Sequence, residues 1–204
     1  MAAAIAFAVI GGYADAIGFL RYHAFAGMMT GNTVLMGLAL FRRADLPAWD
    51  YAGLLAIFFL AAVAAFLLLR YLPPVLLLIG EAVLILLADV FGGAAWAAIF
   101  LVAAMGIQNP VGARFGLAIN TTFITGDILR FAEGLTRRRG DKDPAVREGF
   151  AIFGWVWLAY ALGAALGVAA FRLVERPLVL PVVLLGFVYA WERLHPSPKS
   201  HNRS

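Results

Sequence analysis

Long apolar stretches separated by short connections constrain this chain more than any other feature. A helix that crosses a bilayer needs about 20 apolar residues, because a rise of about 1.5 Å per residue must cover a hydrocarbon core about 30 Å thick. Eight stretches of this kind follow one another, with one longer polar loop from Arg137 to Glu148. They lie at about residues 2–20, 24–41, 50–69, 74–90, 95–110, 117–135, 150–171 and 177–191. The pattern predicts an all-α, polytopic helical membrane protein with 6 to 8 hydrophobic segments.

Composition agrees with this prediction and narrows the classes of partner. Of the 204 residues, 63% are hydrophobic and 14% are charged, a balance unlike that of soluble domains. The arginines lie at segment ends, where they reach lipid headgroups, so we expect the bilayer and not a nucleic acid as partner. The chain has no cysteine, and it has no cluster of His, Asp and Glu at metal-ligand spacing. We therefore expect neither a metal nor a cofactor.

The second half of the chain repeats polar features of the first half. Thr30-Gly31-Asn32 recurs as Thr125-Gly126-Asp127, 95 positions later, and at that offset the four apolar segments of each half correspond. Internal duplication is the simplest explanation, and secondary transporters often place their sites between such repeats. We predict one membrane domain over residues 1–204, with repeat one at about 1–94 and repeat two at about 95–191. A disordered polar tail is expected at 192–204.

Segments 24–41 and 117–135 leave two topologies open. Both are rich in Gly, Thr and Asn, so each either crosses the membrane or enters it and returns to the same side. In the first case eight segments span, and in the second case six span and the repeats are inverted. Most lysines and arginines fall on the side of the C-terminus in both topologies. The positive-inside rule therefore predicts a cell inner membrane protein whose C-terminus is cytoplasmic.

Polar residues within the apolar segments gather at two places that correspond in the repeat. A charged side chain at a helix centre costs about 2.5 to 3.5 kcal/mol on insertion scales, so such residues are expected to face a cavity or a partner. The candidate residues for binding a solute or an ion are Asp15, Thr30, Asn32, Gln108, Asn109, Thr121, Thr125 and Asp127. We predict that they form two half-sites that converge on one polar region.

Glycines within these clusters would let a membrane-depth helix open. Gly31 and Gly126 each follow a Thr and precede an Asn or Asp. An opened helix exposes backbone groups that water in a cavity can satisfy, which is typical of a solute or ion site. Glycine also permits close helix packing, and for Gly163-x-x-x-Gly167 we expect packing alone.

Two carboxylates are candidate proton carriers. Glu81 is the most isolated carboxylate of the chain, because it lies within a continuous apolar stretch, and Asp15 lies within the first segment. The alternative for Glu81 is an ion pair with Arg70 or Arg114. The alternative for Asp15 is a structural hydrogen bond to a Thr or Asn of a neighbouring helix.

Four ordered motifs carry a resemblance to a known family. They are Gly12-Tyr13-Ala14-Asp15-Ala16-Ile17-Gly18-Phe19, Met29-Thr30-Gly31-Asn32-Thr33, Gly106-Ile107-Gln108-Asn109 and Thr121-Thr122-Phe123-Ile124-Thr125-Gly126-Asp127. Together they resemble the YoaK family of bacterial membrane proteins, over essentially the whole chain. The resemblance implies about six spans and a family without an assigned function. Family members often have Asn where this chain has Asp127, which here brings a charge within helical pairing distance of Arg130.

Missing residues exclude several activities. The only serines are Ser197, Ser200 and Ser204, and the only lysines are Lys142 and Lys199, all outside the apolar segments. A membrane-embedded serine hydrolase and a retinal-type Schiff base are thereby excluded. No Gly-rich loop ends in Gly-Lys-Thr or Gly-Lys-Ser, so ATP-driven transport by this chain alone is excluded too. We expect no enzyme activity and no catalytic residue.

The leading functional hypothesis is a gradient-driven secondary transporter of a small polar or ionic solute. Its site would lie at the interface of the two repeats. One alternative is an oligomeric channel lined by the same polar residues, which would make a homo-oligomer the working unit. The other is a non-transporting membrane scaffold or partner protein, in which the polar clusters only join helices.

Overall fold

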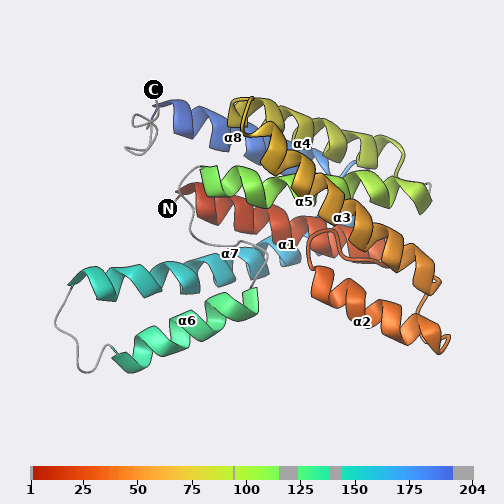
Figure 1. Ribbon diagram of the computed structural model, residues 1–204, viewed down its shortest axis with the longest axis horizontal. Coiled ribbons are helices and arrows are strands. Elements are labelled where there is room, and N and C mark those ends of the chain that lie inside the picture. The colour runs from red at the N-terminus through yellow and green to blue at the C-terminus, as the bar shows by residue number, and fades with distance from the viewer. Residues whose placement is uncertain (1, 94, 115–123, 138–143, 195–204) are drawn as a thin grey trace.

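The computed structural model describes residues 2–93, 95–114, 124–137 and 144–194, and every regular element in these ranges is helical (Figure 1). The α-helices are α1 (Ala2–Tyr22), α2 (Met29–Leu40), α3 (Ala48–Leu68), α4 (Pro74–Val90), α5 (Ala98–Arg114), α6 (Ile124–Arg137), α7 (Pro144–Leu173) and α8 (Val179–Leu194). A 3-10 turn, η1 (Ala95–Ala97), precedes α5. Of the tail expected at 192–204, the first three residues continue α8 and residues 195–204 lie outside the described ranges.

Three helices are long and apolar enough to cross a membrane. Within the described ranges these are α1, α3 and the Ala151–Leu173 part of α7. The remaining apolar helices are shorter, and α4 and α5, with 17 residues each, lie at the lower limit for a span. The prediction of an all-α, polytopic helical membrane protein is confirmed.

Proline fixes where two of these helices begin. Pro47 and Pro73 precede α3 and α4 in an extended conformation, with φ of -65° and -66°. Pro74 then occupies the first position of α4, where the missing N–H costs no helical hydrogen bond. Pro110, by contrast, lies inside α5, which continues to Arg114, four residues beyond the end expected from hydropathy. Neighbouring helices make such interior prolines tolerable in membrane proteins.

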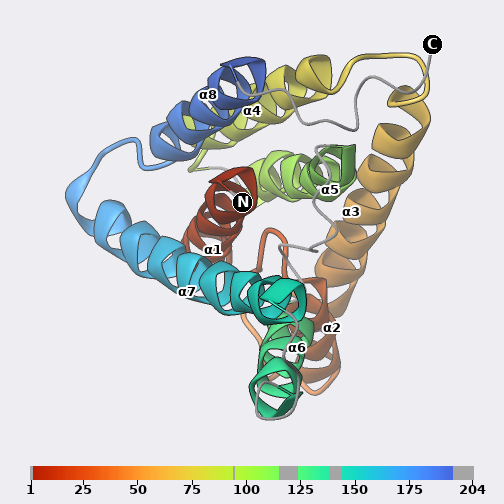
Figure 2. The ribbon, with the colours of Figure 1, turned by 90° about the vertical axis from the view of Figure 1, so that its left-hand side faces the viewer.

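Helix α1 lies in the interior of the molecule, and α7 packs directly along it (Figure 2). A Cβ atom on Gly12 would overlap the backbone of Tyr160, and one on Gly163 would overlap the backbone of Val9. A Cβ on Gly167 would lie 2.8 Å from the Tyr13 carbonyl oxygen. Glycine is therefore required on both helices for this close approach, and the packing role expected for Gly163-x-x-x-Gly167 is confirmed.

The helices of the two halves make equivalent contacts. In the first half α3 packs on α2 and α5, and in the second half α7 packs on α6 and α1. In the same way α4 packs on α5, and α8 packs on α1. Two further contacts, α1 with α5 and α4 with α8, join helices that the predicted repeat would pair. Figure 2 shows α1 and α5 inside, with α7 and α3 on opposite flanks and α4 and α8 along the third side.

Helix α2 is shorter than a membrane crossing requires. It has 12 residues, which span only about 18 Å at about 1.5 Å per residue. The residues on its two sides also lie together, because His23 Nδ1 is 3.2 Å from the Asp45 carboxylate and the Tyr51 hydroxyl donates to the His23 carbonyl at 3.0 Å. Segment 24–41 therefore enters the molecule and returns to the same end, as the six-span topology requires.

Helix α6 has a similar place in the second half. It has 14 residues, about 21 Å, and packs on α7. In Figure 1, α2 and α6 extend toward opposite ends of the long axis. Residues 117–123 of the second segment lie outside the described ranges, so only its helical part is compared here with α2.

Candidate functional site

Asp15 binds the backbone of the segment that leads into α2. Its Oδ1 accepts hydrogen bonds from the N–H groups of Gly27 at 2.6 Å and Met28 at 3.1 Å. Its Oδ2 accepts a hydrogen bond at 2.5 Å from the Tyr160 hydroxyl of α7. Asp15 is 3% exposed and lies about two turns before the end of α1. The chain after α1 therefore folds back about 10 Å into the molecule before α2 begins.

Asn32 of α2 also binds the backbone of this segment, at Phe25. Its amide nitrogen donates to the Phe25 carbonyl at 2.8 Å, and its amide oxygen accepts from the Phe25 N–H at the same distance. Asn32 is the buried residue of α2, whereas Thr30, two positions earlier, is exposed. The structure thus brings Asp15 and Asn32 together around residues 25–28, with their hydrogen-bonding groups used by backbone groups and by the Tyr160 hydroxyl.

Gln108, a predicted residue of the second half, binds a different part of α1 from the one that holds Asp15. The Gln108 side-chain N–H donates to the Phe7 carbonyl of α1 at 3.0 Å, while Gln108 Oε1 is buried without a hydrogen bond among the described residues. Asn109 follows it in α5 and is half-buried. Thr121 lies outside the described residues, and so does the side chain of Thr125.

Asp127 occupies the position in α6 that corresponds to Asn32 in α2. It is 2% exposed, and its Oδ2 has no hydrogen bond within the described part of the chain. Burial raises the pKa of Asp127 to about 6, and the nearby Arg130 opposes this rise. The Arg130 guanidinium lies 5.2 Å from the centre of the Phe153 ring, so it is held over an aromatic face.

Glu81 is the most isolated polar side chain that the structure describes. It is 0% exposed, and neither of its carboxylate oxygens has a hydrogen-bond partner among the described residues. It shares the buried face of α4 with Leu77, Leu78 and Ile85. The alternative of an ion pair with Arg70 or Arg114 is wrong, because neither Glu81 oxygen has a partner among the described residues, and the Arg114 guanidinium donates instead to the Leu69 carbonyl at 2.9 Å.

The sequence did not point to a polar cluster at the end of the molecule where α1 and α4 terminate. Asp89 lies 3.4 Å from the Arg21 guanidinium and accepts from the Leu178 N–H at 3.3 Å. The Tyr22 hydroxyl donates to the Ala88 carbonyl at 2.9 Å beside them. The available signal is the presence of opposite charges at the ends of two apolar segments, which the general assignment of segment-end arginines to lipid headgroups overlooks.

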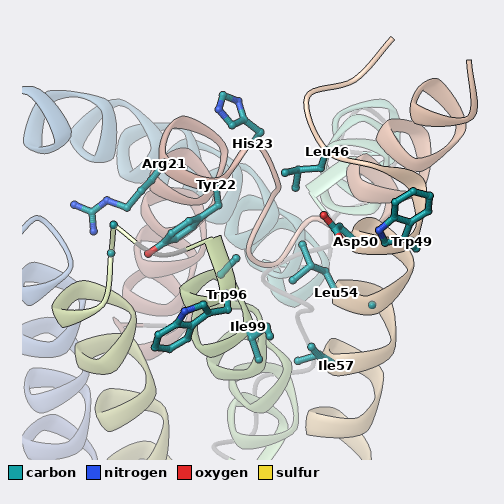
Figure 3. A pocket seen from close by; sticks show the side chains of 14 residues that line it. Arg21, Tyr22, His23, Leu46, Trp49, Asp50, Leu54, Ile57, Trp96 and Ile99 are labelled. Carbon is teal, nitrogen blue, oxygen red and sulfur yellow. The ribbon is translucent and has the colours of Figure 1, made fainter. Parts of the chain in front are cut away.

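A cavity of about 500 Å³ opens near this cluster, between α3 and the start of α5 (Figure 3). None of the predicted solute-binding residues that the structure describes lines it. The predicted half-sites and this cavity are therefore two different places in the fold.

Comparison with known sequences assigns the chain to a family. A family described as a protein of unknown function, DUF1275, matches residues 3–191. The match extends from the first turn of α1 into the last turns of α8, so it includes every predicted solute-binding residue as well as Arg21 and Asp89. No curated protein and no solved structure matches the chain.

Proposed function

The chain belongs to the DUF1275 family, whose function is unknown, and we propose that it is a gradient-driven secondary transporter of a small polar or ionic solute. The observation that carries the proposal is Glu81, a fully buried carboxyl without a hydrogen-bond partner among the described residues. Ionisable residues inside membrane helices are costly and mark proton or substrate pathways. The proposal requires no cofactor and no ATP site.

The two halves of the chain are, in this proposal, copies related by an inverted repeat. Equivalent helix contacts in the halves support it, as does the recurrence of Thr30-Gly31-Asn32 at residues 125–127. The non-crossing helix α2 leaves an odd number of crossings in the first half, so the second half has the opposite orientation. Rocking of one half against the other would then open the space between them to each side in turn.

The solute would bind where α2 and α6 begin. Both helices are short, and the start of α2 lies inside the molecule at the depth of Asp15, where a helix N-terminus favours a ligand with negative charge or acceptor oxygens. Asp15 and Asn32 act as positioning residues, because their bonds to residues 25–28 hold the start of α2 at the depth of Asp15. Thr30, Gln108, Asn109, Thr121, Thr125 and Asp127 are the remaining candidates for direct contact.

Glu81 would carry the coupling proton. An ionised carboxylate without partners in an apolar interior loses its hydration and gains nothing in exchange. Binding a proton removes that penalty, and admission of water on one side of the membrane allows the proton to leave. Helix α4 contacts both α5 and α8, so Glu81 lies where the two halves meet.

The proposed location is the cell inner membrane of a bacterium, with the C-terminus in the cytoplasm. With α2 and α6 not crossing, Arg70, Arg114 and the basic residues after α6 fall on the cytoplasmic side, and Arg42 and Arg43 fall outside. Lys and Arg are then in excess inside, as the positive-inside rule requires. The bacterial YoaK family, which the four sequence motifs resemble, fits this location.

Reconstitution tests this function directly. Purified protein in sealed vesicles with an imposed pH gradient should accumulate at least one compound from a panel of amino acids, organic acids, amines and inorganic ions. Accumulation that collapses when an ionophore dissipates the gradient supports the proposal. Ion currents far above the turnover of a carrier would assign the chain to the channel class instead. The absence of both flux and current would contradict transport.

One observation favours the scaffold alternative. The hydrogen-bonding groups of Asp15 and Asn32 are used by the backbone and by Tyr160, as expected of residues that only join structural elements. A scaffold needs no unpartnered carboxyl, so Glu81 separates the two functions. A Glu81→Leu variant that raises thermal stability without changing flux from any compound would favour the scaffold.

A further inference from the structure

The cavity at the end of the molecule has two facing walls. Figure 3 shows Asp50, Leu54 and Ile57 along α3 on one side, and Trp96 and Ile99 on the side of α5. The volume of about 500 Å³ falls within the range of small-molecule binding sites, which are mostly apolar with a few polar groups. The cavity is thus large enough for an organic ligand and is built like a site for one.

The charges around the cavity leave one carboxylate available. Arg21 lies 3.4 Å from Asp89, and Figure 3 shows its side chain pointing away from Asp50. The His23 imidazole lies 3.2 Å from the Asp45 carboxylate. Asp50 has no ion pair among the described residues and lies in the first turn of α3, where the N-terminal dipole stabilises its negative charge. The charge that a ligand meets in this cavity is therefore negative.

Aromatic side chains add a second attraction for a cation. Trp96 lines the cavity, and its ring contacts Phe91 and Phe100 with centroids 5.1 and 5.8 Å away, which holds the indole in place. Tyr22 also lines the cavity. Aromatic faces attract organic cations, with Trp the strongest of the three ring types. The apolar walls accept an alkyl group at the same time.

We propose that this cavity binds an organic ammonium cation that carries a short apolar group. The ammonium lies near Asp50 and the face of Trp96, and the alkyl group contacts Leu54, Ile57 and Ile99. The proposal does not depend on transport, because the described solute-binding candidates all lie outside the lining of this cavity.

The position of the cavity also links the ligand to the re-entrant hairpin, which is the segment of residues 24–45 that contains α2. Residues 21–23 lead into this hairpin and residues 46–50 follow it, and both stretches contribute to the lining. An occupant thus contacts both ends of the segment that contains α2. Because a ligand stabilises the state that binds it, the melting temperature rises with ligand concentration.

Butyltrimethylammonium and butanesulfonate are matched probes for this site. Titrated into the purified full chain in an uncharged detergent, the ammonium should bind and quench tryptophan fluorescence, and the sulfonate should not. Asp50→Asn should weaken binding of the ammonium at least about tenfold, which corresponds to about 1.4 kcal/mol. Glu175→Gln removes an exposed carboxylate that does not line the cavity and should leave binding unchanged.

A second variant separates the aromatic contribution from the charge. Trp96→Leu should weaken ammonium binding several-fold while the melting temperature without ligand stays near that of the original protein. Calorimetry replaces fluorescence for this variant, because the reporter is removed. Equal affinity for sulfonate and ammonium, or unchanged ammonium affinity in Asp50→Asn, would overturn the proposal.

Discussion

The segment that joins α1 to α2 and the interior of α4 each surround a buried carboxyl group, but only the first supplies it with hydrogen-bond donors. At the joining segment, Asp15 accepts three hydrogen bonds, two from the backbone and one from Tyr160. In α4, Glu81 is equally buried and accepts none from the described residues. A satisfied carboxylate contributes to stability, whereas an unsatisfied one lowers it. Asp15 therefore serves the fold, whereas the presence of Glu81 needs a reason other than stability.

The largest expected effect is on transport, from Glu81→Gln. The amide is nearly isosteric but cannot carry a proton, so flux driven by a pH gradient should fall at least about tenfold. Proton-coupled uptake in sealed vesicles measures this. Glu175→Gln, an exposed change of the same chemistry, should keep full flux. Normal pH-driven flux in Glu81→Gln would remove Glu81 from the mechanism.

The next effect is on stability, from Asp15→Asn. The amide nitrogen cannot accept a hydrogen bond, so at least one donor among Gly27, Met28 and Tyr160 loses its partner. The free energy of unfolding should fall by about 1 to 3 kcal/mol for each buried donor left unpaired. Thermal melting in detergent measures it. Asp45→Asn, whose exposed pair with His23 contributes at most about 1 kcal/mol, is the matched control. Equal melting temperatures of the two variants would contradict the proposal that Asp15 holds the backbone of Gly27 and Met28 in place.

The smallest expected effect is the pH dependence of stability that Asp127 confers. Its pKa is about 6 in the folded protein, above the ordinary value of 3.8, so the folded state binds the proton more tightly than the unfolded state does. The contribution of Asp127 to stability is then largest below about pH 4 and is lost as the pH rises through about 6. Asp127→Asn should flatten melting temperature against pH across this window. A profile unchanged by the substitution would show that Asp127 is not desolvated.

Hydropathy was sufficient for the helical fold because apolar length alone decides whether a helix can lie in a bilayer. It could not place segment ends where polar residues continue a helix. The seventh helix begins at Pro144 and not near residue 150, and α2 begins at Met29 and not at residue 24. Before α2, residues 24–28 fold back along α1 because Asp15 and Asn32 bind their backbone. Hydropathy does not show how deep in the membrane such a segment lies.

The candidate site was predictable only in part, for a related reason. Composition shows that Asp15, Asn32 and Glu81 are polar groups among apolar ones, and the structure confirms that all three are buried. The sequence does not reveal whether a buried group meets a backbone partner, since that depends on the path of residues 25–28. The Arg21–Asp89 pair was missed because two segment ends far apart in the sequence meet only in the folded chain.

Water access to the start of α2 tests the central claim most directly, because a transporter needs a hydrated path at that depth. The chain has no cysteine, so single cysteines can be placed at Thr30 on α2 and at Leu60, which is 62% exposed on α3. A charged methanethiosulfonate added to both sides of reconstituted vesicles should modify Thr30→Cys but not Leu60→Cys. If neither cysteine reacts, α2 faces lipid, no hydrated path lies beside it, and the transport account is contradicted.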